Sequence, residues 1–165
     1  MLPDGIHHAC QWLQSLPFSQ EIAESEWLFP TIETLHVLAL VLVVGSISLV
    51  DLRLLGLRAR ERPFSQVARE MLPLTWSAFV VAAVAGFLMF ASKATTYAAN
   101  WPFQLKVLCL GLAAINMLVF HCVGNRCLSE WDTTATPMAA KLAGGVSLTL
   151  WVTIVAAGRW IGFTT

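Results

Sequence analysis

Long apolar runs alternate with short polar stretches along the whole chain. Four of these runs are about 20 residues long, which is the length that an α-helix needs to cross a hydrocarbon core of about 30 Å. The pattern therefore predicts an all-α integral membrane protein that forms a four-helix bundle in one domain over residues 1–165. The predicted spans are 28–50, 74–92, 103–123 and 139–161.

Outside these runs, two segments have an identifiable pattern. Residues 1–26 carry no Lys or Arg and no long apolar core, so they do not resemble a cleavable signal peptide. Instead their apolar points, interrupted at Pro17, predict a short interfacial helix, in one piece or two. The apolar points are Trp12, Leu13, Leu16, Phe18 and Ile22. The connection at 51–72 is long enough for the first helix to continue until near Pro63.

Composition and charge agree with a membrane location. The chain is 57% hydrophobic and 12% charged, with a mean hydropathy of +0.69, which is far more apolar than an ordinary soluble domain. A net charge of zero argues against a nucleic-acid partner. By the positive-inside rule, the Arg-rich connection between the first two spans is cytoplasmic and both termini face outward. The residues concerned are Arg53, Arg58, Arg60, Arg62 and Arg69.

Ionisable side chains within the predicted spans mark a candidate site near the outer surface. Such residues are costly in hydrocarbon and normally face the bundle interior, which makes them functional-site hypotheses. His36 follows Trp27 by nine positions, roughly 14 Å along the helix, and Glu33 is one turn nearer the outside. Lys106 and Arg159 fall near the outer ends of the third and fourth spans. If their helices face one another, these four residues form one outer site.

A second histidine marks a different depth. His121 lies near the inner end of the third span, with Arg126 and Arg53 at a similar level. Very roughly 10 to 15 Å of depth separate it from His36, too much for both imidazoles to ligate one iron. The two histidines therefore predict two separate sites, one in each leaflet.

These two sites suit haem b. A non-covalent haem needs an axial imidazole, an apolar slot and cations near its propionates. His36 with Lys106 and Arg159, and His121 with Arg53 and Arg126, supply the imidazoles and cations. We therefore expect a membrane haem b protein in electron transfer or quinone-linked redox chemistry, with a quinone or a periplasmic redox partner. Each iron would take a second ligand from His7, His8, Met89 or another subunit, or keep an open position.

Other readings of the same residues stay open. Glu33, Lys106 and Arg159 would also suit a non-catalytic protein that transports or binds a small molecule. His7, His8 and His36 could form a copper site at the outer face. A carboxylate-bridged di-iron site would need further Glu residues, which the spans lack. Each histidine is explained equally well as a core residue that ties two helices together.

The fourth span indicates how the protein assembles. Ala140, Gly144 and Gly145 have the spacing of small residues that lets helix backbones approach closely. This spacing predicts a homo-oligomer. The cysteines, by contrast, form no CxxC pair and predict free thiols. They are Cys10, Cys109, Cys122 and Cys127.

Several short motifs occur in a recognisable order. They are WLFPTIETLH, DLRLLG, FQLK, FH, WD and AGRW. In this order the chain resembles, over nearly its whole length, a family of small bacterial four-span membrane proteins described as a domain of unknown function. The resemblance implies the fold and the membrane location but no activity. The histidine placement is also loosely similar to membrane b-type cytochromes of the cytochrome b561 and CopD kind, although those proteins pair histidines at matching depths and this chain does not.

Overall fold

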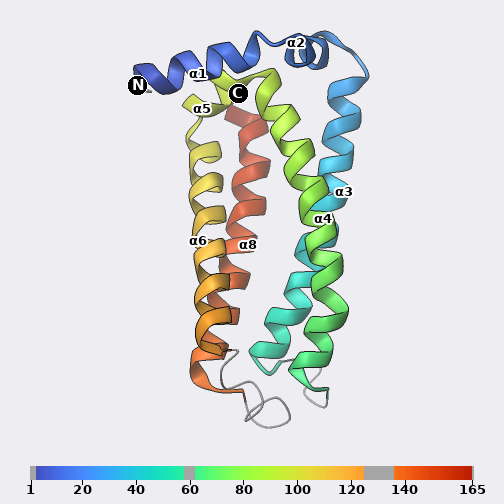
Figure 1. The fold of residues 1–165 in the computed structure, drawn as a ribbon, viewed down its shortest axis with the longest axis vertical. Coiled ribbons are helices and arrows are strands. Elements are labelled where there is room, and N and C mark those ends of the chain that lie inside the picture. The colour runs from blue at the N-terminus through green and yellow to red at the C-terminus, as the bar shows by residue number, and fades with distance from the viewer. Residues whose placement is uncertain (1–2, 58–61, 125–135, 165) are drawn as a thin grey trace.

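The computed structural model describes residues 3–57, 62–124 and 136–164. Four long helices form a bundle (Figure 1), and each is long and apolar enough to cross a membrane. The helices are α3 (Leu28–Leu54), α4 (Phe64–Ser92), α6 (Trp101–Gly124) and α8 (Met138–Thr164). The predicted all-α four-helix bundle is therefore confirmed, and the chain is a multi-pass membrane protein.

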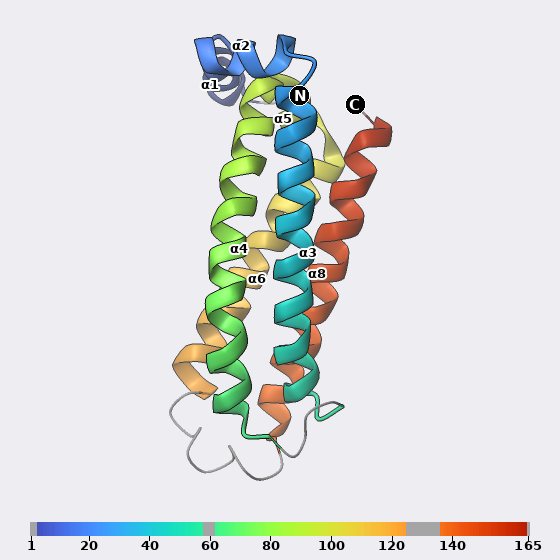
Figure 2. The ribbon, with the colours of Figure 1, turned by 90° about the vertical axis from the view of Figure 1, so that its right-hand side faces the viewer.

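Three short helices gather at one end of the bundle, which we call the terminal end because both chain termini lie there. They are α1 (Asp4–Gln14), α2 (Pro17–Glu24) and α5 (Ala94–Ala99). In Figures 1 and 2, α1 and α2 run across this end, roughly perpendicular to the long helices. The helices α3 and α6 run away from the terminal end, and α4 and α8 return to it. We call the opposite end the distal end.

The connection between α3 and α4 differs from the prediction. The first helix does not continue to Pro63: α3 ends at Leu54, and Gly56 adopts a φ of 70°. A left-handed residue just past the last turn is a common helix stop, and glycine adopts it at little cost. Pro63 instead caps the start of α4, which begins ten residues before the predicted second span and continues through Pro73.

The four helices associate as two pairs. Helix α3 packs most closely against α4, and α6 against α8, while α3 and α8 join the two pairs. The middle of the bundle is a cluster of buried side chains that all four helices supply, namely Val43, Ala78, Cys109, Trp151 and Ile154.

Helices α4 and α6 meet differently, through aromatic rings. Phe90 stacks on Phe103 near the terminal end, with ring centroids 5.1 Å apart. Phe64 meets Phe120 edge-on near the distal end, at 5.8 Å. Large side chains therefore bridge this side of the bundle.

Small residues of α8 allow this helix to pack closely against α3. Ala140 is 3% exposed and belongs to a buried cluster with Val50 and Leu54. A Cβ added to Gly144 would lie 3.0 Å from the Cβ of Leu54. The close approach predicted from this spacing is thus an approach of α8 to α3, and a homo-oligomer built on Ala140 and Gly144 does not follow from it. Gly145 faces the rim of this contact, where a Cβ would meet only Leu55, at 3.8 Å.

A pair of hydroxyl groups joins α3 to α4 inside the bundle. The Oγ of Ser46 lies 2.7 Å from the Oγ1 of Thr75, and both residues are buried. Each hydroxyl also lies within hydrogen-bond distance of a carbonyl oxygen four residues earlier in its own helix. Because each hydroxyl keeps that local acceptor, the link between the helices can be removed without stranding a polar group.

Ser46→Ala and Thr75→Val together should therefore measure the value of this link. We expect a coupling free energy of about 0.6 kcal/mol and not above ~1.7 kcal/mol, which is the range for hydrogen bonds between membrane helices. The measurement is a double-mutant cycle on the free energy of unfolding in detergent. Strictly additive single effects would show that the two hydroxyls do not stabilise one another.

Candidate functional site

His36 is fixed between α3 and α4. Its Nδ1 lies 2.7 Å from the carbonyl oxygen of Ala82. A carbonyl oxygen can only accept a hydrogen bond, so Nδ1 carries the proton and Nε2 keeps a free lone pair. Gly86 lies one turn further along α4, where a Cβ would come within 2.9 Å of the imidazole Cε1. The carbonyl group of Ala82 therefore fixes the orientation of the ring, and the absence of a side chain at Gly86 leaves room for it.

Lys106 approaches the same level from the other helix pair. Its side chain passes Gly158 of α8, where a Cβ would lie 3.6 Å from Nζ. Its ammonium and the carboxylate of Glu33 both lie close enough to interact electrostatically with the imidazole of His36. We call Glu33, His36 and Lys106 the His36 cluster. Among the described residues, no carboxylate lies within 4.0 Å of the Lys106 ammonium, so its charge has no direct counter-ion there.

Tyr97 of α5 borders this cluster at the terminal end. Burial raises the pKa of its phenol, and the nearby charge of Glu33 raises that pKa further. Because α5 lies outside the four spans, sequence reasoning gave no reason to place Tyr97 beside Glu33. The phenol stays neutral at physiological pH, where it is available as a hydrogen-bond donor.

Arg159, the fourth residue predicted for the outer site, lies elsewhere. It is exposed, and its guanidinium lies 4.9 Å from the ring centroid of Phe163, four residues further along α8. Its charge is not among those that act on His36. The structure thus brings Glu33, His36 and Lys106 together and leaves Arg159 on the outside of α8.

The residues predicted for the inner site lie apart from the His36 cluster. His36 is about 12 Å along α3 from Leu28, whereas His121 is about 30 Å along α6 from Trp101. His121 is exposed near the distal end. Since α3 and α6 run in the same direction (Figure 1), the two imidazoles are at different levels, and these lengths differ by about 18 Å, more than the 10 to 15 Å estimated from the sequence.

Arg53 has a structural environment at the distal end. It is 3% exposed, and its Nε donates to the carbonyl oxygen of Arg62 at 2.8 Å. Its Nη1 donates to the Oγ1 of Thr136 at 3.3 Å. These bonds tie the end of α3 to the segments that precede α4 and α8. Arg126, its predicted companion, lies outside the described residues.

Asp51 is a buried carboxyl group that sequence reasoning did not select. It is 3% exposed, and its carboxyl group lies near the hydroxyl of Ser147 on α8. Its Oδ2 has no hydrogen-bond partner among the described residues. The helices α3 and α8 come close here, since a Cβ on Gly144 would lie 3.1 Å from the carbonyl oxygen of Asp51. Asp51 belongs to this contact between helices and lies about 22 Å along α3 from His36.

The histidines at the N-terminus lie in α1 across the terminal end. The rings of His7 and His8 are 6.4 Å apart, and His7 borders a polar cavity of about 410 Å³ together with Gln14 and Thr95. No group of three His, Cys, Asp or Glu residues in the described part of the chain is placed to hold one metal ion. The ligand set of His7, His8 and His36 predicted for copper is therefore not assembled.

Gly86 and Gly158, which make room for His36 and Lys106, were not predicted as part of the site. The sequence around Gly86 does contain a relevant pattern. Ala78, Ala82 and Gly86 recur every fourth residue on α4, which is the spacing of a face that accepts a close neighbour. That face receives α3 and its imidazole. Gly158 lies four residues before Gly162 on α8, but a Cβ at Gly162 would meet nothing within 4 Å, so this spacing does not indicate the contact with Lys106.

Comparison with known proteins agrees with this fold. A family described as "Family of unknown function (DUF6644)" matches residues 28–164, which include all four long helices. No curated protein and no solved structure matches the chain. The match covers the whole bundle and every residue of the His36 cluster, so the chain belongs to this family of unknown function.

Proposed function

We propose that the His36 cluster binds haem b, with the Nε2 of His36 as the axial ligand. The observation that carries this proposal is the hydrogen bond from Nδ1 to the carbonyl oxygen of Ala82. Histidines that ligate metals almost always donate their other ring N–H to a carbonyl or carboxylate, which fixes the tautomer and the ring plane. His36 has this arrangement, half-buried within the membrane span.

Two further features fit the group. Lys106 brings a cation to the same level, with no direct counter-ion among the described residues, and haem propionates are anionic. Of the histidines in the described residues, only His36 lies at this level, so a haem held by His36 alone would be five-coordinate. Bound haem supplies one-electron redox chemistry and an open coordination position. His36 would hold the iron, and Lys106 would orient the propionates. A second haem at His121 stays a prediction.

We also propose a bacterial inner membrane, with the terminal end in the periplasm. The distal end and its two connections hold Arg53, Arg58, Arg60, Arg62, Arg69, Arg126 and Lys141, and cytoplasmic connections are enriched in such residues. The His36 cluster then lies in the periplasmic leaflet, within reach of a quinone or a periplasmic redox partner. The loose similarity to b-type cytochromes and the formation of a homo-oligomer remain predictions.

The absorption spectrum of the purified protein tests the haem. We expect a Soret band with a high-spin, five-coordinate signature, and we expect His36→Ala to lose it completely. His8→Ala, which changes an exposed histidine, is the matched control and should keep the band. His121→Ala should remove a second haem only if the inner site exists. A folded preparation without iron, made in cells supplied with haem precursors, would rule the haem out.

The missing counter-ion of Lys106 favours one other function, the binding of an anion or a quinone carbonyl without a metal. The same preparation distinguishes the two. A colourless protein that binds a quinone, and loses it in Lys106→Met but not in Lys93→Met, would replace the haem proposal with this one. Lys93 is the control because it is an exposed cation, 5.5 Å from the ring of Phe29.

A further inference from the structure

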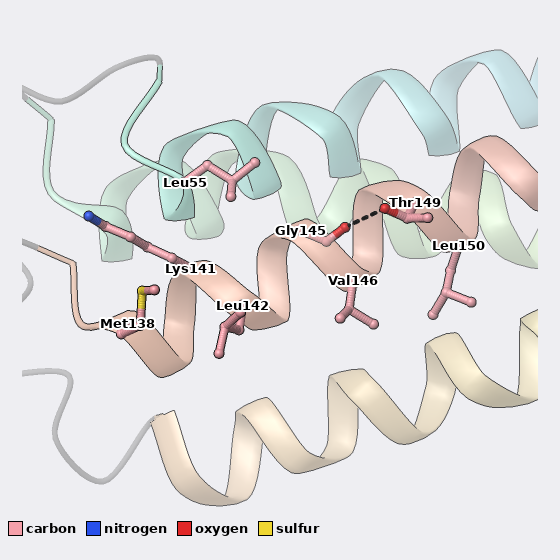
Figure 3. A pocket seen from close by; sticks show the side chains of 8 residues that line it. All are labelled: Leu55, Met138, Lys141, Leu142, Gly145, Val146, Thr149 and Leu150. Atoms are coloured by element: carbon pink, nitrogen blue, oxygen red, sulfur yellow. Dashed lines mark hydrogen bonds between the residues drawn. The ribbon is translucent and has the colours of Figure 1, made fainter.

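We infer that α8 carries a binding groove for the acyl chain of an anionic phospholipid from the leaflet at the distal end. A cavity of about 660 Å³ lies along the outer surface of α8, where the end of α3 forms one wall. Figure 3 shows the side chains that border it, all from α8 except Leu55, which directly follows α3. Among them are Lys141, Leu142, Gly145, Val146 and Leu150.

The walls of this groove are apolar, and they leave space at one residue. Leu142 and Val146 are 60% and 48% exposed. Gly145 has no side chain to fill the groove between Leu55 and the α8 surface. The one hydroxyl in the wall, that of Thr149, donates to the carbonyl oxygen of Gly145 at 2.9 Å. Apart from Lys141 at one end, the side chains that border the groove therefore present no free hydroxyl and suit a hydrocarbon chain.

Lys141 sets the charge of the occupant. It lies three residues after Met138, the start of α8, and extends along the groove toward the distal end (Figure 3). No carboxylate lies within 4.0 Å of its ammonium among the described residues. A cation at the membrane boundary attracts anionic lipid headgroups. From Lys141 to Leu150 the groove runs about 13 Å, close to the ~15 Å depth of one hydrocarbon leaflet. One acyl chain with its phosphate at Lys141 matches both the charge and the length.

A second copy of this chain fits the groove less well. Helix α8 contains no Asp or Glu, so a symmetric contact between two α8 helices would bury both Lys141 ammonium groups without a counter-ion. Burying an unpaired charge costs several kcal/mol, whereas a lipid phosphate supplies the missing negative charge. The inference concerns the opposite end of the bundle from the His36 cluster and is independent of the haem.

Native mass spectrometry of the detergent-purified protein, titrated with either phosphatidylglycerol or phosphatidylethanolamine, tests this site. We expect the wild type to retain one phosphatidylglycerol at least tenfold more tightly than phosphatidylethanolamine. Gly145→Leu fills the groove and should abolish retention of that lipid. Lys141→Gln should remove the preference for phosphatidylglycerol while leaving weak binding of both lipids.

Two variants serve as matched controls. Gly111→Leu places the same side chain at an exposed glycine of α6 with no heavy atom within 4 Å, so it also reports whether a leucine on the lipid face harms folding. Arg69→Gln removes an exposed cation of α4 near the distal end. Both should bind lipid as the wild type does. Equal retention of the two lipids by the wild type, undiminished binding in Gly145→Leu, or a dimer that excludes lipid from Gly145 would each overturn the inference.

Discussion

Gly86→Ala is expected to lower the free energy of unfolding by about 1–3 kcal/mol, the usual cost of one overpacked methyl group. The added Cβ would lie 2.9 Å from the Cε1 and 3.3 Å from the Nδ1 of His36. The imidazole cannot retreat freely, because Nδ1 is hydrogen-bonded to the carbonyl oxygen of Ala82. Either that bond breaks or α3 and α4 separate. Thermal unfolding in detergent would measure the loss, and any haem bound at His36 should be released with it.

Gly111→Ala is the matched control for this prediction. It makes the same chemical change in the middle of α6, at a position with no heavy atom within 4 Å. Alanine is the better helix former by up to about 1 kcal/mol, so this variant should be as stable as the wild type or more stable. If Gly86→Ala matched Gly111→Ala in stability, the close packing of His36 on α4 would be wrong.

Lys106→Met is expected to move stability and ligand binding in opposite directions. Methionine keeps much of the length of the side chain and removes an ammonium that has no direct counter-ion among the described residues. Unfolding should therefore become harder, by on the order of 1 kcal/mol, because an unpaired charge no longer has to leave water. Binding of an anionic or carbonyl-bearing ligand at the His36 cluster should fall at least tenfold. Residues that serve a site often reduce stability in this way.

Two variants calibrate this result. Lys106→Arg keeps a cation and should retain the ligand better than Lys106→Met does. Lys93→Met removes an exposed cation and should change neither property. A Lys106→Met protein that was less stable than the wild type would show that the ammonium has a structural partner instead of a ligand. Chemical unfolding and ligand titration on the same samples would supply both readouts.

The depth of each site residue in the membrane could be estimated from the sequence. The direction in which its side chain faces around the helix could not. The apolar runs located the four spans, and counting residues at 1.5 Å each placed His36 and Lys106 in the outer half of the bundle. Whether a side chain faces inward depends on which neighbour its helix packs against. Arg159 has a suitable depth but faces away from the bundle, where it meets Phe163.

Some helix boundaries could be predicted from the sequence and others could not. A proline inside an apolar run usually marks a helix boundary, so the second span was predicted to begin after Pro73. The helix in fact continues through Pro73 and begins at Phe64. The stop after α3 was visible in principle as Gly56, two residues before the charged run that begins at Arg58. The partners of His36 could not be predicted, since a backbone carbonyl leaves no chemical signature in a sequence and the spacing of Ala82 and Gly86 does not identify which helix packs there. Both became evident only when α4 was placed beside α3.

The contact between α4 and α6 consists of aromatic ring pairs and differs in kind from the close packing of the other helices. Closely packed helices, such as α3 and α4, are held together by many contacts along their length. Here Phe90 with Phe103, and Phe64 with Phe120, carry the contact instead. Direct association of α4 with α6 therefore depends on two side-chain pairs near opposite ends of the bundle, and not on a close approach of the two backbones.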